Sequence, residues 1–192
     1  LMSLGITSIQ AYRTPKVAVI SSGDELVPPK EKLAKGMIRD INLYTIGALI
    51  EGLGASPTLF PRVPDEFDEL LEVGKKAMEL SDMIVFTSGS SISSRDLTAQ
   101  VINKMGSPGV LIHGLSVKPG KPTILGFSAG KPVIGLPGNP VSAITIFKAV
   151  VDPLLRLISG KKIVRSFKTV EAILNSNLSS TSGRTDYVRV KL

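Results

Sequence analysis

Residues 83–91 read Met-Ile-Val-Phe-Thr-Ser-Gly-Ser-Ser, and the order of residue types in this stretch indicates the fold class. A short apolar run such as 83–86 is typical of a strand, and the small hydroxyl residues and glycine after it are typical of a loop. A helix is predicted next, from about Ser94 to Met105, because Leu97, Val101 and Met105 recur every four residues. The stretch thus predicts strand, loop and helix in succession, which is the repeating unit of an α/β domain.

The same unit recurs on both sides of this stretch. Six strands are predicted, at residues 16–20, 56–60, 83–86, 110–117, 123–127 and 132–136. Four helices are predicted to begin at Asp40, Asp65, Ser94 and Pro140. The last continues to about Ile158, and Pro153 is expected to kink or split it, because proline has no N–H to donate. Residues 15–160 are therefore expected to form a three-layer αβα domain with a mostly parallel sheet.

Two shorter segments flank this domain. Residues 1–14 precede the first predicted strand, and Ser159–Lys162 has the composition of a linker. Beyond it, strands are predicted at 167–174 and 186–192, around a loop rich in Ser, Thr, Asn and Gly. Two or three strands are marginally stable alone, so residues 161–192 are expected to start a small all-β domain that the chain leaves incomplete.

Composition narrows the class of protein. With 192 residues and 43% hydrophobic content the chain can bury a substantial core, which excludes disorder and coiled coil as descriptions of the whole. The absence of cysteine excludes disulfide frameworks, thiolate nucleophiles and Cys-based zinc sites, and a single histidine, His113, excludes multi-histidine metal cages. No apolar run reaches the ~18 residues of a membrane span. We expect a soluble, cytoplasmic protein without a membrane partner.

The net charge of +7 raises the question of nucleic-acid binding. Residues 1–160 hold 16 Lys and Arg against 14 Asp and Glu, whereas residues 161–192 hold 7 against 2. The basic residues of this tail alternate with apolar ones and have few aromatic neighbours, which is typical of solvated strand faces rather than of a surface on which bases stack. No nucleic-acid partner is expected.

Ligands of open parallel sheets bind beyond the carboxyl ends of the strands, so the loops after the predicted strands form the candidate site. The first loop consists of Thr87, Ser88, Gly89, Ser90 and Ser91. Its hydroxyls and backbone N–H groups precede a helix and could form an anion-binding nest. An ordinary strand-to-helix turn uses the same residue types and remains the alternative.

A second candidate loop is Pro137-Gly-Asn-Pro140. Asn139 is placed to cap the following helix, Pro140 suits its first position, and Gly138 tolerates positive φ. The same arrangement would expose the N–H groups near Ser142 to a ligand. A tight helix start and a binding loop are compatible interpretations of this motif.

Charged side chains complete the candidate site. Lys118 and Lys121 lie in the loop Lys-Pro-Gly-Lys-Pro, whose prolines lower the entropic cost of ordering both cations around an oxyanion. The alternative is a solvated lysine turn. Asp24, Glu25 and Asp96 follow two of the strands, where they could hold Mg²⁺ against phosphate oxygens or orient a water molecule. Isolated surface acids and helix caps are the alternative for these carboxylates.

Five motifs, in one order along one sheet, resemble those of a known family. They are Ser21–Leu26 (SSGDEL), Gly36–Asn42 (GMIRDIN), Thr87–Gly89 with Asp96 downstream, Val117–Pro122 (VKPGKP) and Gly135–Ser142 (GLPGNPVS). Together they are similar to those of the molybdopterin molybdotransferases (MoeA type) of molybdenum cofactor biosynthesis, which are related to the gephyrin E domain. The resemblance extends over nearly all of the chain. It implies a MogA-like domain followed by the start of the family's C-terminal β domain, without the family's N-terminal domains.

The resemblance also implies a reaction, in which molybdate is inserted into adenylylated molybdopterin with release of AMP, assisted by Mg²⁺. It implies catalytic roles for Asp24, Glu25, Asp96, Lys118 and Lys121, with the three carboxylates holding the metal. Substrate-binding residues implied in the same way are Thr87, Ser88, Gly89, Ser90, Ser91, Pro137, Gly138, Asn139, Pro140 and Ser142. The resemblance further implies that the full-length proteins of this family are homodimers. It also implies an adenylyltransferase of the same pathway as a partner.

The chain departs from the family pattern in one loop. Ser90 stands where the second glycine is expected, and Ser94 and Arg95 replace a small-acidic pair. A Cβ at Ser90 would narrow the anion nest, because glycine permits close approach of a ligand. Two alternatives to the molybdotransferase therefore stay open. One is a molybdopterin-binding or scaffolding relative without full activity, and the other is a MogA-type molybdopterin adenylyltransferase.

Overall fold

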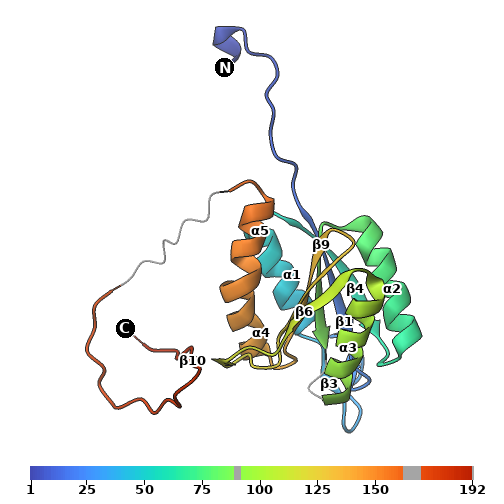
Figure 1. The fold of residues 1–192 in the computed structure, drawn as a ribbon, viewed down its shortest axis with the longest axis vertical. Helices are drawn as coiled ribbons and strands as arrows, with labels where there is room; N and C mark the ends of the chain where they lie inside the picture. Colours follow the sequence, from blue (N-terminus) through green and yellow to red (C-terminus); the bar gives the residue numbers. More distant parts are fainter. Residues whose placement is uncertain (89–91, 162–169, 192) are drawn as a thin grey trace.

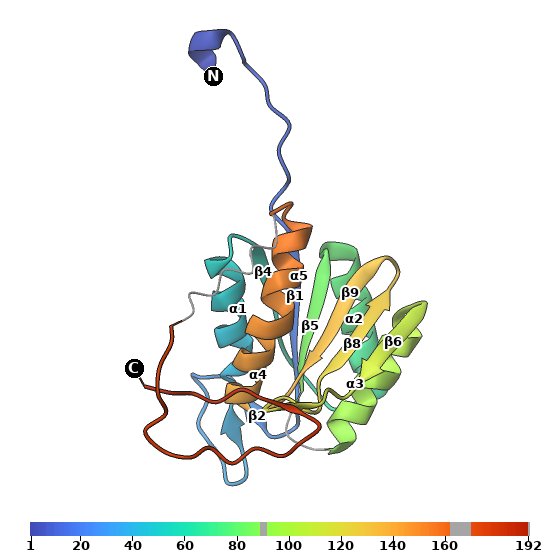
Figure 2. The same cartoon turned by 60° about the vertical axis from the view of Figure 1, so that its left-hand side comes forward.

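A six-stranded sheet lies at the centre of the structure, a computed structural model that describes residues 1–88, 92–161 and 170–191, with the backbone alone for 92–95. Figure 1 shows the sheet between its helices, and Figure 2 shows its strand order from left to right, β4–β1–β5–β9–β8–β6. The strands are β1 (Lys16–Ser22), β4 (Ser56–Val63), β5 (Met83–Ser88), β6 (Pro108–His113), β8 (Ile124–Ser128) and β9 (Lys131–Leu136). β4, β1, β5 and β9 are parallel, and β8 is antiparallel to both β9 and β6. The prediction of a mostly parallel sheet is confirmed.

Helices cover both faces of this sheet, which gives the predicted three layers (Figure 2). One face carries α1 (Asn42–Gly52), α4 (Pro140–Ile146), the π-helical segment η2 (Phe147–Val151) and α5 (Asp152–Ile158). The other face carries α2 (Phe67–Leu80) and α3 (Ile92–Met105). No helix in the described part of the chain is long and apolar enough to cross a bilayer.

The sequence of β1 explains why both faces of the sheet are covered. Val17 and Val19 pack into the apolar cluster beneath α1 and α5, whereas Ala18 and Ile20 pack into the cluster beneath α2 and α3. All four side chains are fully buried. Because successive strand residues point to opposite faces, a strand covered on both sides has an uninterrupted apolar run instead of an alternating pattern.

The helical stretch after β9 changes its winding before Pro153. Residues 147–151 form a π-helical segment between α4 and α5, and Pro153 lies in the first turn of α5. The wider turn accommodates a residue that has no N–H to donate to the preceding turn. The prediction that Pro153 interrupts this helix is confirmed.

Two short parallel strand pairs lie outside the main sheet. β2 (Leu26–Val27) pairs with β3 (Ile38–Arg39), and β7 (Val117–Lys118) pairs with β10 (Thr185–Asp186). The strand predicted at 110–117 is thus divided into β6 and β7, with Gly114 at φ +92° between them. A local apolar pattern does not reveal where a strand leaves its sheet, so the prediction missed this break.

The C-terminal segment differs from its predicted strands. Of the segments predicted at 167–174 and 186–192, residues 167–169 and 192 lie outside the described residues, and 170–174 and 187–191 are not strands. Most described residues from 170 to 191 are exposed, and β10 alone pairs, with the two residues of β7. These strand predictions are wrong because an alternating pattern forms a strand only where a neighbouring strand takes up its hydrogen bonds.

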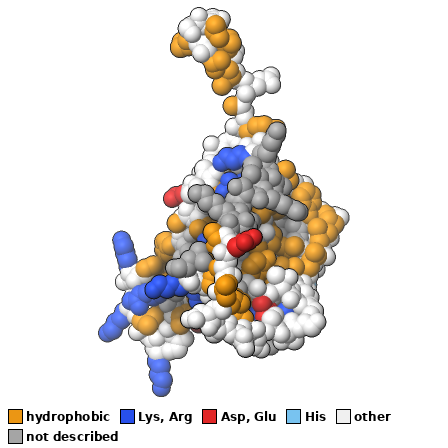
Figure 3. Space-filling view, turned by 90° about the vertical axis from the view of Figure 1, so that its left-hand side faces the viewer, with side chains coloured by type: hydrophobic (Ala, Val, Ile, Leu, Met, Phe, Trp, Pro, Cys, Tyr) orange, Lys and Arg blue, Asp and Glu red, His pale blue; other side chains and the backbone are white. Residues whose placement is uncertain are grey.

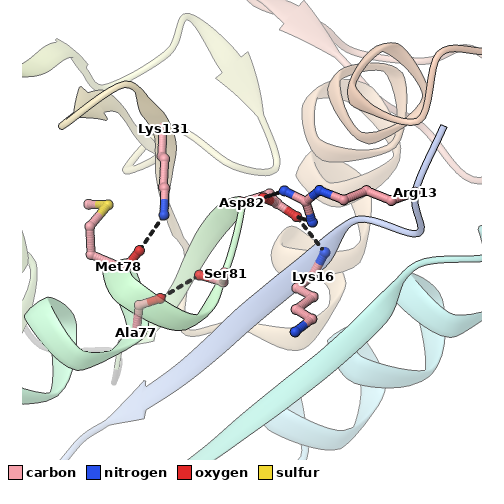
Figure 4. Close-up of polar contacts among 7 residues, drawn as sticks. All are labelled: Arg13, Lys16, Ala77, Met78, Ser81, Asp82 and Lys131. Carbon is pink, nitrogen blue, oxygen red and sulfur yellow. Dashed lines mark hydrogen bonds and ion pairs between the residues drawn. The ribbon is translucent and has the colours of Figure 1, made fainter.

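Asp82 joins the incoming chain to the turn before β5, at the amino edge of the sheet (Figure 4). Its carboxylate accepts hydrogen bonds from the Arg13 guanidinium, one of them at 2.8 Å, and from the Lys16 N–H at 2.9 Å. The Arg13 hydrogen bond lowers the pKa of Asp82 below its usual range, and the Lys16 N–H and the charge of Lys131 act in the same direction against partial burial. The folded protein therefore favours the charged carboxylate.

The loop Lys118–Pro122 packs closely against α4, with Gly120 next to the side chain of Ile146. Gly120 has φ +116°, and a Cβ at this position would overlap the side chain of Ile146. Ile146 is fully buried in the cluster beneath α1 and α5. The core thus sets the position of this loop, and glycine is required both for its backbone conformation and for the close approach.

Replacing Asp82 by alanine is expected to lower the free energy of unfolding at pH 7 by about 1 kcal/mol, the typical net contribution of one hydrogen bond such as that to the Lys16 N–H. Because folding lowers the pKa of Asp82, its contribution is present above the unfolded value of about 3.9 and is lost as pH falls through the folded value. Urea unfolding curves of the wild type and Asp82→Ala should therefore converge as the pH is lowered from 4 towards 2. An equal difference at every pH would contradict this assignment.

Gly120→Ala is expected to lower the free energy of unfolding by about 2–4 kcal/mol, because backbone strain and overlap with Ile146 add. Gly130→Ala is the matched control: Gly130 also has positive φ, +79°, but no atom lies within 4 Å of its Cβ position. The control should lose only the conformational part, about 1 kcal/mol. Thermal unfolding followed by circular dichroism measures both, and equal losses would show that the contact with Ile146 does not position the loop.

Candidate functional site

Three parallel strands bring the candidate loops to one edge of the sheet. In the sheet register, Ser21 of β1 pairs with Thr87 of β5, and Thr87 pairs with Leu136 of β9. The loops that follow these strands therefore begin at neighbouring points. The expectation that they share an edge is confirmed, although Gly89, Ser90 and Ser91 of the middle loop lie outside the described residues.

Asn139 forms the predicted cap of the helix after β9. Its side-chain oxygen accepts hydrogen bonds from the N–H groups of Val141, at 3.0 Å, and Ser142, at 3.2 Å. The Ala143 N–H donates to the Asn139 carbonyl at 2.9 Å, and Pro140 occupies the first turn. The cap is thus confirmed, but these N–H groups are used within the helix start. The expectation that they face a ligand is wrong, because the cap itself takes up their hydrogen bonds.

The same loop is tied to the start of α1. Asn42 Nδ2 donates a hydrogen bond to the Gly138 carbonyl at 2.8 Å. Pro137 is buried, and Gly138 and Pro140 are half-buried at the edge of the sheet. Asn42, which the sequence analysis did not select, therefore holds this loop against a segment almost a hundred residues earlier.

A cavity of about 490 Å³ opens beside Lys118 and Lys121. It is lined by residues 115–122, Ser142 and residues 182–184. Three of the lining side chains are cationic (Lys118, Lys121 and Arg184), and none of the described lining residues is acidic. We call this the basic cavity. It joins the predicted lysines to Ser142, which lies on a different element.

Arg184 is a site residue that the sequence analysis missed. It reaches the basic cavity because the C-terminal segment pairs with β7: the Thr185 N–H donates to the Ser116 carbonyl at 2.8 Å, and the Tyr187 N–H to the Lys118 carbonyl at 2.7 Å. In the sequence Arg184 is one of several basic residues in a polar tail. Nothing in its local pattern indicates this pairing partner.

Asp186 orients Arg184 at the cavity. The Arg184 Nε donates to one carboxylate oxygen at 2.7 Å and a second guanidinium nitrogen lies 3.4 Å from the other oxygen. The hydrogen bond from Arg184 lowers the pKa of Asp186 below its usual range, helped by the Ser180 hydroxyl and by the positive charges of Arg184 and Lys118.

On the face that Figure 3 shows, Lys and Arg side chains gather towards one side, next to hydrophobic surface.

The three predicted metal ligands lie apart from the basic cavity. Asp24 is 71% exposed, 3.6 Å from Arg62, and also accepts a hydrogen bond from the Asp65 N–H at 3.4 Å. Asp96 is exposed on α3, about one turn from its start. Among the described residues no three His, Cys, Asp or Glu side chains are placed to hold a metal ion. In the described part of the chain these carboxylates do not form a ready-made metal site, and an Mg²⁺ ion held by them would take its other ligands from phosphate oxygens and water.

Buried polar atoms without partners mark a second part of the same edge. Ser21 Oγ, Asp40 Oδ2 and Thr87 Oγ1 are buried and have no hydrogen-bond partner within the described chain. At the amino edge the polar groups are paired instead, since Ser81 Oγ donates to the Ala77 carbonyl at 2.6 Å (Figure 4). Buried polar atoms are normally satisfied, so unpaired ones at a sheet edge favour a ligand site. For Ser21 and Thr87, the sequence feature that could have indicated a site is a polar residue at the end of an apolar strand. For Asp40 the sequence offers only its predicted role as a helix cap, which does not indicate a ligand.

A protein-family profile and several curated proteins match this domain. A family profile described as "Probable molybdopterin binding domain" matches residues 18–157. A molybdopterin molybdenumtransferase of Haemophilus influenzae is 35% identical over 189 residues, which cover 98% of this chain and 46% of that protein. One from Nostoc sp. is 34% identical over 155 residues, covering 79% of this chain and 35% of that protein. The chain spans about half the length, or less, of these curated relatives.

Solved structures agree with this match. A molybdopterin biosynthesis MoeA protein from Pyrococcus horikoshii is 42% identical with a TM-score of 0.71, over 78% of this chain and 37% of that one. The tungsten cofactor synthesizing protein MoaB from Pyrococcus furiosus, 23% identical with a TM-score of 0.53, shares the fold over 78% of this chain and 99% of its own. The profile begins in β1 and ends in α5, so it covers the sheet and its helices. The chain belongs to the family of molybdopterin-binding domains that this profile describes.

Proposed function

We propose that this chain forms the substrate-binding domain of a molybdopterin molybdotransferase, which inserts molybdate into adenylylated molybdopterin and releases AMP. The observation that carries the proposal is the basic cavity, where Lys118, Lys121 and Arg184 line one space together with Ser142. Molybdate and phosphate are oxyanions, and charge-assisted hydrogen bonds from Lys and Arg are the strong contacts that such groups make in proteins. The names of the curated relatives are consistent with this reaction.

The two lysines act on the oxyanion in this proposal. Lys118 and Lys121 would donate to oxygens of molybdate or of a substrate phosphate. The hydroxyl of Ser142, which lies 3.4 Å from Asn139 Oδ1, would turn from that oxygen to add a neutral donor. The loop geometry supports this assignment, because Gly120 holds the segment between the lysines against the core. Positions set by packing are preorganised for an anion and need little ordering upon binding.

The neighbouring loops would hold the rest of the substrate. Thr87 and Ser88 lie at the end of β5, beside Gly138 and Pro140 in one cavity. We assign this group, with Gly89, Ser90, Ser91, Pro137 and Asn139, to binding of the phosphorylated pterin. Asp24, Glu25 and Asp96 would hold Mg²⁺ with phosphate oxygens of the substrate. The bound ion would offset the negative charge of the phosphoanhydride.

The proposal includes the protein's assembly and place of action. We propose a homodimer, an adenylyltransferase of the same pathway that supplies the adenylylated substrate, and a cytoplasmic location. The support is the resemblance of the motifs quoted above. Light scattering after size-exclusion chromatography tests the dimer, and cell fractionation tests the location.

The reaction is tested by mixing the chain with adenylylated molybdopterin, Mg²⁺ and molybdate. Release of AMP that depends on molybdate is the expected result. Binding of the substrate without release would favour the molybdopterin-binding or scaffolding relative. Adenylylation of molybdopterin from ATP would instead identify an adenylyltransferase and contradict the proposal.

Lys118→Ala and Lys121→Ala are each expected to weaken binding of molybdate by about tenfold to one hundredfold, because each removes a charge-assisted hydrogen bond of about 1.5–3 kcal/mol. Isothermal calorimetry with sodium molybdate measures the affinity. Lys104→Ala, an exposed lysine in the last turn of α3, is the matched control and should bind as the wild type does. Unfolding temperatures should change little in all three variants, since exposed lysines contribute little to stability. Unchanged affinity in both loop variants would favour the solvated lysine turn.

A further inference from the structure

A second, smaller cavity of about 210 Å³ lies at the carboxyl edge of the sheet, and we call it the Asp40 cavity. Its polar lining comes from β1, from the connection between β3 and α1, from the start of α1 and from β5 (Ser21, Asp40, Asn42, Thr87 and Ser88). Apolar walls come from Leu26, Ile38, Ile41 and Pro140. Sites for drug-sized ligands are commonly about 300–1,000 Å³, so this cavity suits one flat ring system and not a whole nucleotide-like substrate.

Two hydrogen bonds and burial fix the position of Asp40 at this cavity. Its N–H donates to the Val27 carbonyl at 3.0 Å, and its Oδ1 accepts from the Leu43 N–H at 3.1 Å at the start of α1. The residue is 4% exposed. Its second oxygen, Oδ2, is buried without any hydrogen-bond partner among the described residues. The hydrogen bond from the Leu43 N–H thus uses one oxygen of the carboxylate and leaves the other available.

The cationic residue that lines this cavity does not satisfy the oxygen. Arg39 also lines the cavity, but its Nε donates to the Pro29 carbonyl at 3.1 Å, and another guanidinium nitrogen lies 3.5 Å from the Glu31 carbonyl. The guanidinium is therefore directed to the turn between β2 and β3. Two further buried acceptors, Ser21 Oγ and Thr87 Oγ1, are also without partners within the described chain. A buried polar group without a hydrogen bond lowers the stability of the folded protein, and a ligand that donates hydrogen bonds to these groups would restore it.

We propose that the Asp40 cavity recognises the 2-amino-4-oxopyrimidine ring of a pterin through Asp40 Oδ2. This ring carries an amino group next to a ring N–H, and a carboxylate oxygen accepts from such donors. The apolar residues would contact the faces of the ring, and the hydroxyls of Ser21 and Thr87 would meet its remaining polar atoms. The inference rests on the proposed function, because it assigns the pterin end of that substrate to one cavity and the oxyanion to the other.

The walls of the cavity distinguish this ligand from a cation. Mg²⁺ binds in octahedral geometry and keeps several of its waters, so it favours sites rich in oxygen. The Asp40 cavity offers one unpaired carboxylate oxygen among four apolar side chains. A flat heterocycle with hydrogen-bond donors on one edge can use both the oxygen and the apolar walls.

The test compares two pteridines that differ at one position. Pterin carries the 2-amino group, and lumazine has a carbonyl oxygen there. In fluorescence titrations the wild type should bind pterin at least tenfold more tightly, because a lumazine carbonyl would face the carboxylate of Asp40. Asp40→Asn turns an acceptor into a donor, so the preference for pterin should be lost or inverted. Asparagine caps helices as well as aspartate does, and the Leu43 hydrogen bond can be kept.

Control variants separate recognition from folding. Asp68→Asn makes the same change at an exposed position of α2 and should leave the preference unchanged. Thr87→Val removes a second unpaired group without touching the α1 cap and should weaken pterin binding severalfold. Equal binding of both pteridines by the wild type, or the same preference in Asp40→Asn, would overturn the inference. Binding of Mg²⁺ alone, lost in Asp40→Asn, would overturn it in favour of a cation site.

The two proposals fail separately. Molybdate binding that depends on Lys118 and Lys121, together with no discrimination between pteridines, would overturn the inference and leave the proposed function standing. Discrimination between pteridines without any molybdate binding would support the pterin site and overturn the proposed oxyanion site.

Discussion

Strands β1, β5 and β9 run parallel in the middle of the sheet and are buried on both faces, and the arrangement of the site depends on this constraint. Parallel neighbours point in the same direction, so every strand of this set ends at the same edge, and the chain must cross back over the sheet between them. Ser21, Thr87 and Leu136 are aligned there by hydrogen-bond register. The aligned residues are 66 (Ser21 to Thr87) and 49 (Thr87 to Leu136) positions apart in the sequence, yet the loops that follow them begin side by side.

The two edges of the sheet use polar groups differently. At the amino edge Asp82 is paired with Arg13 and with the Lys16 N–H, so its charge supports the fold. At the carboxyl edge Thr87 and the second oxygen of Asp40 are buried without partners in the described chain. A fold selected for stability alone would not retain such groups, because each unpaired buried acceptor is destabilising. Their presence at the edge where ligands bind in such sheets agrees with the proposed division into an oxyanion site and a ring site.

Long-range contacts complete both cavities. Arg184 reaches the basic cavity through the pairing of β10 with β7, and Asn42 holds the loop at Gly138 from the start of α1. Neither residue has a local pattern that predicts its partner. The same limit explains the wrong strand predictions in the C-terminal segment, where alternation is present but the described residues find only the two-residue partner β7.

The sequence by itself determined the α/β class, the mostly parallel sheet, the cap at Asn139 and the interruption at Pro153. These features depend on residue types within one or two turns of each other, and local backbone chemistry governs them. Tertiary structure alone decided that Arg184 joins the two loop lysines, Lys118 and Lys121, in one cavity, and that Asp40 keeps an unpaired oxygen in a cavity that Thr87 also lines. The physical reason is that burial and hydrogen-bond satisfaction are properties of the packed chain, which depend on neighbours brought from distant parts of the sequence.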